Sequence, residues 1–262
     1  MSLLEIKNYS VINSKENEES FILKNINFCV NHSDTLAIIG ESGSGKSTIA
    51  KSIICLIDKN LKVKDGKIFF ENKDIFNLND EEKRLLRREK ISFLPQESLN
   101  VLDPLVKVGK QISEVISHNE LLTKQQRQDL VMEMLNDCAF KEPEQIWHKY
   151  PFELSGGNRQ KILFAIATIP KPKLLITDEP TSSLDFESKN EILELLTRFK
   201  EKNNSTLIFI THDIILASKI SNRIIVLKSG EIIESGLTAD IFNKPQEKYT
   251  QMLIDNAKAI DW

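Results

Sequence analysis

Short runs of apolar residues separated by polar stretches organise the first 40 residues of the chain. Three such runs, rich in Ile, Leu and Val, lie at residues 3–11, 21–30 and 34–40. The polar segment NSKENEES separates the first two runs. Runs of this length, bounded by polar residues, are typical of β-strands. The pattern therefore predicts three strands at the start of the chain.

Helical and strand patterns alternate after residue 40. Apolar residues recur at helical spacing from Lys46 to Leu56 and within 187–202, and a charged helical stretch covers 79–90. Further strands are predicted at 66–70, 90–96, 173–180, 205–213 and 222–236. Strands that alternate with helices predict a mainly parallel sheet covered on both faces, which places the chain in the α/β class.

The pattern is different between about Leu105 and Gln160. Amphipathic helical spacing dominates there, at residues 111–116, 127–140 and 144–150. We interpret this region as a helical insertion into the α/β core. The tail from residue 238 to 262 is predicted to be helical and to pack on the outside.

Composition and charge exclude several classes of protein. The net charge of 262 residues is −3, so no basic field attracts nucleic acid. The N-terminus lacks the pattern of a signal peptide, and no apolar run approaches the ~20 residues that span a bilayer. Three scattered cysteines, Cys29, Cys55 and Cys138, predict neither a disulfide framework nor a zinc site. We expect a cytosolic chain that reaches a membrane only through a partner.

The segment GESGSGKST combines glycines, hydroxyl groups and a lysine between a predicted strand and a predicted helix. It matches G-x-x-x-x-G-K-[ST], in which backbone N–H groups and a helix N-terminus bind phosphates. Lys46 is predicted to reach the β- and γ-phosphates and Ser47 to ligate Mg²⁺. The predicted nucleotide-binding residues here are Gly40, Glu41, Ser42, Gly43, Ser44, Gly45, Lys46, Ser47 and Thr48.

A second candidate group lies in the segment LLITDEP, where a predicted strand ends at Asp178 and Glu179. Asp178 is predicted to hold Mg²⁺, and Glu179 to orient or deprotonate the attacking water. No N-K-x-D guanine signature is present, because Ile75 stands where NKDI would need its second acid. ATP is therefore favoured over GTP.

The segment LSGGNRQK, residues 154–161, follows the helical insertion. With it, the sequence resembles the ATP-binding cassette (ABC) ATPases from about Leu3 to Gly236. Three further motifs of that family follow in order: Gln96 in FLPQES, TSSLD from Thr181 to Asp185, and His212 in FITHD.

The resemblance implies a P-loop NTPase core, an N-terminal antiparallel β subdomain and an inserted α-helical subdomain. Residues 1–262 would form one ABC ATPase domain. The core would comprise 1–104 and 161–236, the helical subdomain 105–160, and the helical tail 237–262.

The resemblance also implies roles for individual residues. Gln96 would sense the γ-phosphate and the metal, and His212 would position the γ-phosphate and the water. Ser155, Gly156 and Gly157 would contact ATP bound to the opposite subunit. Asp185 would lie at the interface of the two subunits. Two subunits would thus enclose two nucleotides.

Two positions depart from the family pattern. Where the family has an aromatic residue that stacks on adenine, this chain has Asn13, with Tyr9 and Phe21 nearby but out of register. The base contact therefore stays open, and Tyr9 is expected in the core or on the surface. Asn158 replaces a common Gln in the signature segment, a change that we expect to be tolerated.

The segment LPQESLNVLDPLVKVGKQISE resembles the peptide/nickel importer group of the family, with Leu102-Asp103-Pro104 and Val108-Gly109 at the matching places. Many peptide-transporting members of that group have a longer, cysteine-containing C-terminal tail than this chain. We therefore favour nickel or a metal chelate over a di- or oligopeptide as the transported substrate. The resemblance implies two integral-membrane permease subunits and a second ATPase subunit, either another copy or a related chain. It also implies an indirect substrate-binding protein, no nucleic acid, and a location at the cytoplasmic face of the membrane.

Two alternatives remain at this point. A soluble ABC ATPase acting on nucleic acid or the ribosome usually has coiled-coil insertions or two cassettes, and neither is present. The basic run 83–90 follows Asp80, Glu81 and Glu82 and is typical of a solvated helix face. The second alternative is a cassette that binds ATP but hydrolyses it poorly. Such a cassette would lack some of the residues that hydrolysis needs, whereas both Lys46 and Glu179 are present here.

Overall fold

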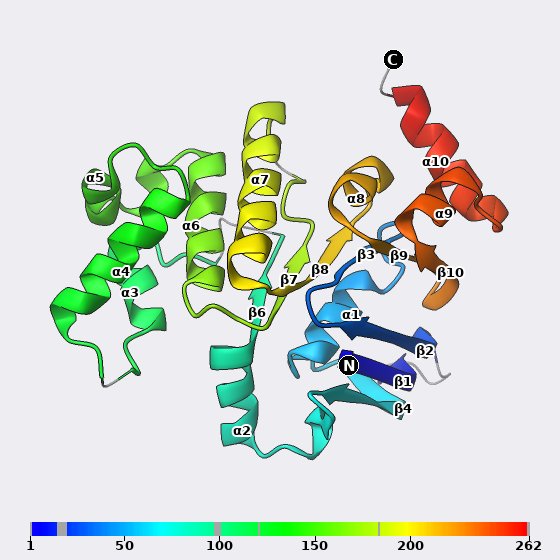
Figure 1. Ribbon diagram of the computed structural model, residues 1–262. Helices are drawn as coiled ribbons and strands as arrows, with labels where there is room; N and C mark the ends of the chain where they lie inside the picture. The colour runs from blue at the N-terminus through cyan, green and yellow to red at the C-terminus, as the bar shows by residue number, and fades with distance from the viewer. Residues whose placement is uncertain (1, 15–19, 97–100, 120, 183, 261–262) are drawn as a thin grey trace.

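The computed structural model describes residues 2–14, 20–96, 101–119, 121–182 and 184–260, which form two β-sheets (Figure 1). The smaller sheet is antiparallel, with strand order β2-β1-β4-β5. Its strands are β1 (Ser2–Asn13), β2 (Phe21–Asn31), β4 (Leu61–Phe70) and β5 (Lys73–Asp74). The predicted antiparallel subdomain is confirmed. β4 begins earlier than residue 66 because Leu61 and Val63 pair with the far end of β1.

The larger sheet has the strand order β10-β9-β3-β8-β7-β6. β10 is antiparallel to β9, and the other neighbouring pairs are parallel. Its strands are β3 (Thr35–Ile39), β6 (Ile91–Leu94), β7 (Leu174–Asp178), β8 (Thr206–Thr211), β9 (Arg223–Lys228) and β10 (Glu231–Leu237). The predicted mainly parallel sheet is confirmed. The carboxyl ends of β3, β8, β7 and β6 therefore lie side by side, at one edge of the sheet.

Helices cover both faces of this sheet, as the alternation of side chains along a strand requires. On β3, Leu36 and Ile38 join a core with the smaller sheet and α1 (Lys46–Ile53). Ala37 and Ile39 of the same strand pack instead toward α8 (Ile214–Ile220). Side chains of β7 and β8 form a further core with α7 (Phe186–Asn203).

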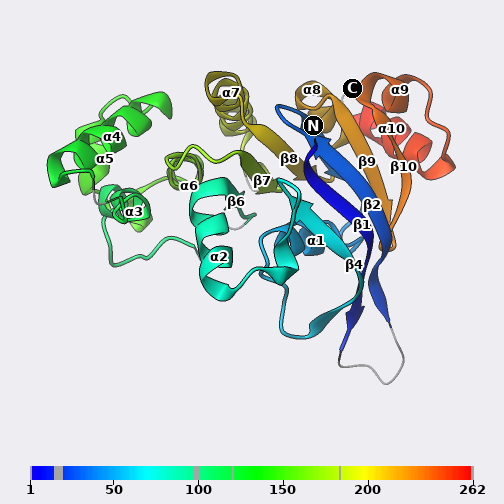
Figure 2. The same ribbon diagram turned by 60° about the horizontal axis from the view of Figure 1, so that its bottom comes forward.

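The predicted helical insertion stands at one end of the molecule, and the C-terminal helices stand at the other (Figures 1 and 2). The helices of the insertion are α3 (Val108–Val115), α4 (Lys124–Asp137) and α5 (Pro143–His148). The charged stretch before β6 forms α2 (Asp80–Leu85) and one π-helical segment, Leu86–Lys90.

One further helix, α6 (Gly156–Thr168), was not predicted by the apolar pattern. Eight of its side chains are buried around most of its circumference, from Gln160 to Thr168, so no polar face marks its period. It begins in the signature segment and runs past residue 160, where the sequence placed the boundary of the helical subdomain.

The tail forms α9 (Thr238–Asn243) and α10 (Lys248–Ile260), which confirms the predicted helical structure. Ile241, Tyr249 and Ile254 are buried in the core that contains Ala37 and Ile39 of β3. Within the described part of the chain, no helix is both long and apolar enough to cross a bilayer.

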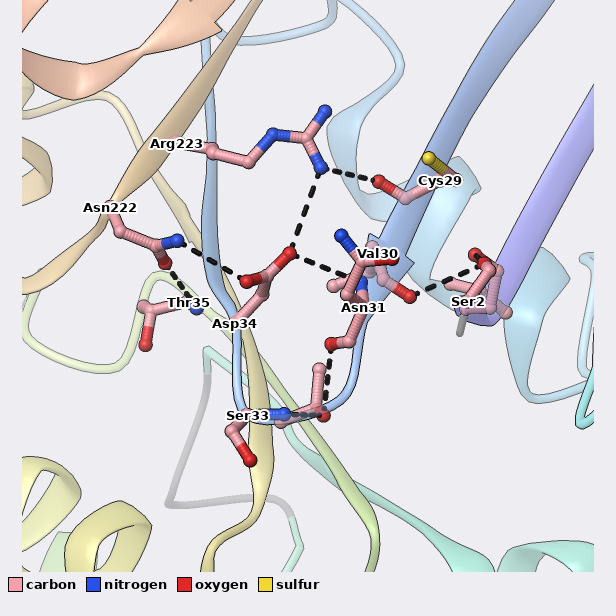
Figure 3. Close-up of polar contacts among 11 residues, drawn as sticks. Ser2, Cys29, Val30, Asn31, Ser33, Asp34, Thr35, Asn222 and Arg223 are labelled. Atoms are coloured by element: carbon pink, nitrogen blue, oxygen red, sulfur yellow. Dashed lines mark hydrogen bonds and ion pairs between the residues drawn. The ribbon is translucent and has the colours of Figure 1, made fainter.

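A polar cluster joins the two sheets at the amino ends of the parallel strands (Figure 3). Asp34 accepts a hydrogen bond from the Asn31 amide at 3.1 Å and from the Asn222 side chain at 3.3 Å. Arg223 lies 3.7 Å from the same carboxylate and donates to the Cys29 carbonyl at 2.8 Å. We call Asn31, Asp34, Asn222 and Arg223 the amino-edge clamp.

Candidate nucleotide-binding site

The predicted phosphate-binding loop connects the carboxyl end of β3 to the N-terminus of α1. Gly45 caps α1 with a φ of 104°, a left-handed conformation that favours glycine. A Cβ atom on Gly45 would lie 2.6 Å from Leu23, and one on Gly40 would lie 2.1 Å from the Leu227 carbonyl oxygen. The glycines are therefore required by the close approach of β2 and β9. Of the nine predicted residues, Glu41, Ser42 and Gly43 are exposed, Ser47 and Thr48 are half-buried, and Gly40, Ser44, Gly45 and Lys46 are buried.

Lys46 lies inside the loop rather than in solvent, with 6% of its surface exposed. Its ammonium group donates to the carbonyl oxygens of Gly40 and Glu41, both at 2.8 Å. Burial lowers the pKa of Lys46, whereas the nearby carboxylates of Glu179 and Asp178 oppose that shift. The loop thus holds a partly desolvated cation, which suits a phosphate oxygen, beside two acids, which suit a metal ion bound with that phosphate.

Asp178 ends β7 next to the phosphate-binding loop and is 6% exposed. Burial raises the pKa of its carboxyl group, and a hydrogen bond with the Ser47 side chain opposes that effect. Its Oδ1 atom and the Ser44 hydroxyl are buried, and neither has a hydrogen-bond partner in the part of the chain that the structure describes. Buried polar atoms without partners are rare in folded proteins, and oxygens of this kind suit a cation such as Mg²⁺.

Glu179 follows Asp178 and has a φ of 49°, an uncommon conformation for a residue with a side chain. Its amide donates to the Ile210 carbonyl at 2.9 Å, which fixes this turn against β8. One carboxylate oxygen, Oε2, lies 2.5 Å from Nδ1 of His212. The Glu179 side chain is 12% exposed and the His212 side chain 63%. A carboxylate held by an imidazole at the mouth of the site can accept a proton from water.

Gln96 lies two residues beyond the carboxyl end of β6 and is exposed. Because β6 pairs with β7 in parallel register, Leu94 beside Thr177, Gln96 emerges at the edge that carries Asp178. Residues 97–100, which follow Gln96 in the segment FLPQES, lie outside the described residues.

The predicted signature residues form a separate group at the start of α6. Ser155 caps this helix, with its hydroxyl accepting from the Asn158 amide at 3.3 Å. A Cβ atom on Gly157 would lie 2.6 Å from the Ser188 hydroxyl, whereas one on Gly156 would meet nothing within 4 Å. Ser188 in turn donates its amide and hydroxyl to Asp185, at 2.9 and 3.0 Å. Ser183 of the TSSLD motif lies outside the described residues.

The structure therefore sorts the predicted residues into two groups. Lys46, Ser47, Asp178, Glu179 and His212 converge at the carboxyl edge, and we call them the carboxyl-edge site. Gly157 and Asp185 both lie next to Ser188, and Ser155 caps the helix that contains Gly157. Among the described residues, no hydrogen bond or ion pair joins the signature residues to the phosphate-binding loop.

Three residues were candidates near the open adenine position. Tyr9 is fully buried and stacks on Phe76, with ring centroids 5.8 Å apart, and burial raises its pKa to about 12. Tyr9 is thus a core residue, which is one of the two places expected for it. Asn13 ends β1 and is half-buried. Phe21 is 38% exposed, and the Lys64 ammonium lies 4.8 Å from its ring centroid.

Two contacts to the phosphate-binding loop were not predicted. The Glu41 amide donates to the Tyr249 hydroxyl of α10 at 3.2 Å, and the Gly230 amide donates to the Ser44 carbonyl at 3.1 Å. Both pairs are far apart in the sequence, and no local pattern marks either of them.

The fold and the carboxyl-edge site define a P-loop nucleotide-binding protein, and comparisons with known proteins specify its family. Residues 23–182 match the family model described as ABC transporter. A shorter match, over residues 150–218, is to a model described as an AAA domain.

Relatives of this chain include ATP-binding transport proteins named for two kinds of substrate. The dipeptide transport ATP-binding protein DppD of Lactococcus lactis is 34% identical, over 99% of this chain and 74% of that protein. The metal-staphylopine import system ATP-binding protein CntD of Staphylococcus aureus is 33% identical, over 100% of this chain and 95% of that protein.

Solved structures agree with these relatives. The ATP-binding cassette MJ0796, in a dimeric post-hydrolysis state bound to ADP and Pi, has a TM-score of 0.80 at 30% identity. The match covers 90% of this chain and 98% of that chain. The cassette cbiO1 of Clostridium perfringens, part of the complex cbiONQ, also has a TM-score of 0.80, at 25% identity over 100% and 99% of the two chains. The chain belongs to the ABC transporter family and is an ATP-binding ATPase subunit.

Proposed function

We propose that this chain hydrolyses ATP at the carboxyl-edge site to power an importer in the membrane. The observation that carries the proposal is the convergence of the Lys46 ammonium, the buried Asp178 and the Glu179–His212 pair beside one phosphate-binding loop. A loop of this kind binds phosphates, and the acids beside it supply the metal ligand and the base.

Each side chain of this site has a proposed task. Lys46 and the loop amides bind the β- and γ-phosphates. The Ser47 hydroxyl, the Asp178 carboxylate and Gln96 would hold Mg²⁺, which when bound neutralises charge on the transferred phosphoryl group. The Oδ1 atom of Asp178 supports this assignment, since that oxygen has no hydrogen-bond partner among the described residues. Glu179 orients the attacking water and accepts its proton, and His212 holds the Glu179 carboxylate.

The signature residues suit a second subunit rather than the same site. Ser155, Gly156 and Gly157 lie at an accessible helix N-terminus, and the space around a Gly156 Cβ is open. We propose that they contact the γ-phosphate bound to a partner ATPase, with Asp185 at the interface. ATP binding then favours the closed pair of subunits, and hydrolysis reopens it. The dimeric state of the MJ0796 cassette supports this arrangement.

The remaining proposals concern organisation. Residues 1–104 and 161–236 are the nucleotide-binding core, 105–160 the helical subdomain, and 237–262 the tail, with α6 shared by the first two parts. The partners would be two membrane permease subunits, a second ATPase subunit and, indirectly, a substrate-binding protein. The chain would act at the cytoplasmic face of the membrane.

Nickel or a metal chelate is the proposed substrate, and a di- or oligopeptide is the second candidate. Relatives named for metal-staphylopine import and for dipeptide transport match at 33% and 34% identity, so both remain in view. The transported substrate binds other subunits, so its identity is tested through transport rather than through this chain.

Uptake in the source organism tests the proposal, with wild type compared with Glu179→Gln at the native locus. Labelled nickel, with and without a chelator, is followed beside a labelled dipeptide. Loss of nickel or chelate uptake alone is the expected result. Loss of dipeptide uptake alone would identify a peptide as the substrate instead of nickel or a chelate. Unchanged uptake of all three would contradict the importer assignment.

A further inference from the structure

The C-terminal helix α10 reaches the phosphate-binding loop through one side chain. Tyr249 is 8% exposed, and its hydroxyl accepts a hydrogen bond from the Glu41 amide at 3.2 Å. Burial raises the pKa of this hydroxyl, and the charge of the Glu41 carboxylate adds to that rise. A residue of the C-terminal helix thus contacts the backbone of the phosphate-binding loop.

The position of the Tyr249 ring is set by packing rather than by the loop. Tyr249 belongs to the core that contains Ala37 and Ile39 of β3 and Ile254 of α10. The Lys228 ammonium lies 4.6 Å from the ring centroid, at the end of β9. Because close-packed side chains keep their rotamers, the hydroxyl is presented to the loop from a rigid support.

The Tyr249 hydroxyl and the Lys46 ammonium bind opposite sides of one peptide group. The Glu41 amide shares its peptide unit with the Gly40 carbonyl, and that carbonyl accepts from Lys46 at 2.8 Å. A trans peptide is planar, with its N–H and C=O pointing in opposite directions. A hydrogen bond on the N–H therefore sets the direction in which the Gly40 carbonyl meets the Lys46 ammonium.

We propose that Tyr249 is a positioning residue for ATP, which orients the Gly40–Glu41 peptide and through it the Lys46 ammonium. The proposal rests on the ATP site proposed above. Tyr249 acts through the loop backbone, so its effect falls on nucleotide affinity rather than on the chemical step.

Tyr249→Phe tests this role because it keeps the ring and removes only the hydroxyl. In the full chain, we expect the Kd for ATP with Mg²⁺, measured by isothermal titration calorimetry, to rise about three- to tenfold, as for the loss of one hydrogen bond. In ATPase assays the KM for ATP should rise by a similar factor while kcat changes less than twofold.

Ile254→Val is the matched control, because it removes one methylene from the same buried cluster. We expect it to lower the melting temperature and to leave the Kd for ATP unchanged. Equal Kd values for wild type and Tyr249→Phe would overturn the inference, as would an equal rise in Kd for Ile254→Val. A wild-type chain that binds no ATP would instead overturn the nucleotide site itself.

Discussion

The two edges of the parallel sheet differ in how completely their charged side chains are paired. At the amino edge, the Asp34 carboxylate has three partners from two other segments, and Arg223 bonds both this acid and a carbonyl. At the carboxyl edge, Asp178 is buried, and one of its oxygens has no hydrogen-bond partner within the described ranges. Glu179 beside it adopts a left-handed backbone conformation. The same sheet thus has paired charges at its amino edge and an incompletely paired carboxylate at its carboxyl edge.

This difference separates what stabilises the protein from what it binds. A buried charge without full pairing costs free energy, and a positive φ at a residue with a side chain costs about 1 kcal/mol or more. A fold retains such features where another molecule supplies the missing interactions. The amino-edge clamp should therefore govern stability and the carboxyl-edge site activity, and substitutions at each edge can separate the two.

The largest expected effect is on turnover, from Glu179→Gln. This change keeps the size of the side chain and removes its capacity to accept a proton, so ATP hydrolysis should fall about 10²- to 10³-fold. ATP affinity should stay within about threefold, because the loop and Lys46 are unchanged. Phosphate release and ATP binding are measured on the same preparation.

Glu187→Gln, in the exposed first turn of α7, is the control and should leave turnover unchanged. We also expect Glu179→Gln to accumulate a dimer in the presence of ATP and Mg²⁺, as seen by size-exclusion chromatography with light scattering. Turnover within threefold of wild type would remove Glu179 from its proposed role.

Asp34→Ala should have the largest effect on stability. It leaves the Asn31 amide and the Arg223 guanidinium without their carboxylate partner, at an expected cost of about 2 kcal/mol in the free energy of unfolding. The affinity of the folded protein for ATP should not change. Urea unfolding and calorimetry at a temperature where both proteins are folded give the two quantities.

Asp58→Ala provides the comparison, since Asp58 pairs with Lys51 at 2.9 Å but is half exposed. An ion pair of this kind contributes about 0.5 kcal/mol. If Asp34→Ala and Asp58→Ala lost equal free energy of unfolding, the amino-edge clamp would contribute no more to stability than an exposed ion pair.

Asp178→Asn should move stability in the other direction by a smaller amount. Burial already disfavours the ionised carboxyl group of Asp178, as its raised pKa indicates. An amide of the same shape removes the buried charge, so we expect the melting temperature without Mg²⁺ to rise by about 1–3 °C. The Mg²⁺ dependence of ATP binding should weaken at the same time.

Asp213→Asn is the control at the same edge, because Asp213 caps α8 by accepting from the Ile215 and Leu216 amides, both at 3.0 Å. Asn is an equally good cap, so this variant should not gain stability. A melting temperature of Asp178→Asn below that of wild type would show that the carboxylate stabilises the fold.

Much of this arrangement was predictable from the sequence, because its determinants are local. The apolar runs predicted the strands, and the motifs placed Lys46 just after one predicted strand and Asp178 at the end of another, which are β3 and β7 of the same parallel sheet. The prediction missed α6, because a helix buried on nearly all sides has no apolar period and this one begins with Gly156 and Gly157. The Tyr249 contact could not be predicted, since it joins residues 208 positions apart through tertiary packing alone.

The smallest expected effect on stability comes from an exposed ion pair at the amino edge. Lys173, just before β7, donates a hydrogen bond to the Glu71 carboxylate, and this bond holds the pKa of Glu71 below its usual 4.5. Glu71→Gln should cost about 0.5 kcal/mol at pH 7, because the two side chains are 34% and 45% exposed and solvent screens the pair.

The sign of the pH dependence follows from the lowered pKa of Glu71. The contribution of the pair is fully present above pH 4.5 and is lost as the pH falls through the lower pKa of the folded protein. The stability difference between wild type and Glu71→Gln should therefore be constant from pH 8 to about 5 and shrink below 4.5. A double-mutant cycle with Lys173→Gln isolates the pair, and 1 M salt should reduce its coupling energy. A coupling energy that does not shrink as the pH falls below 4.5, or one that grows with salt, would mean that Glu71 stabilises this edge by packing instead of by charge.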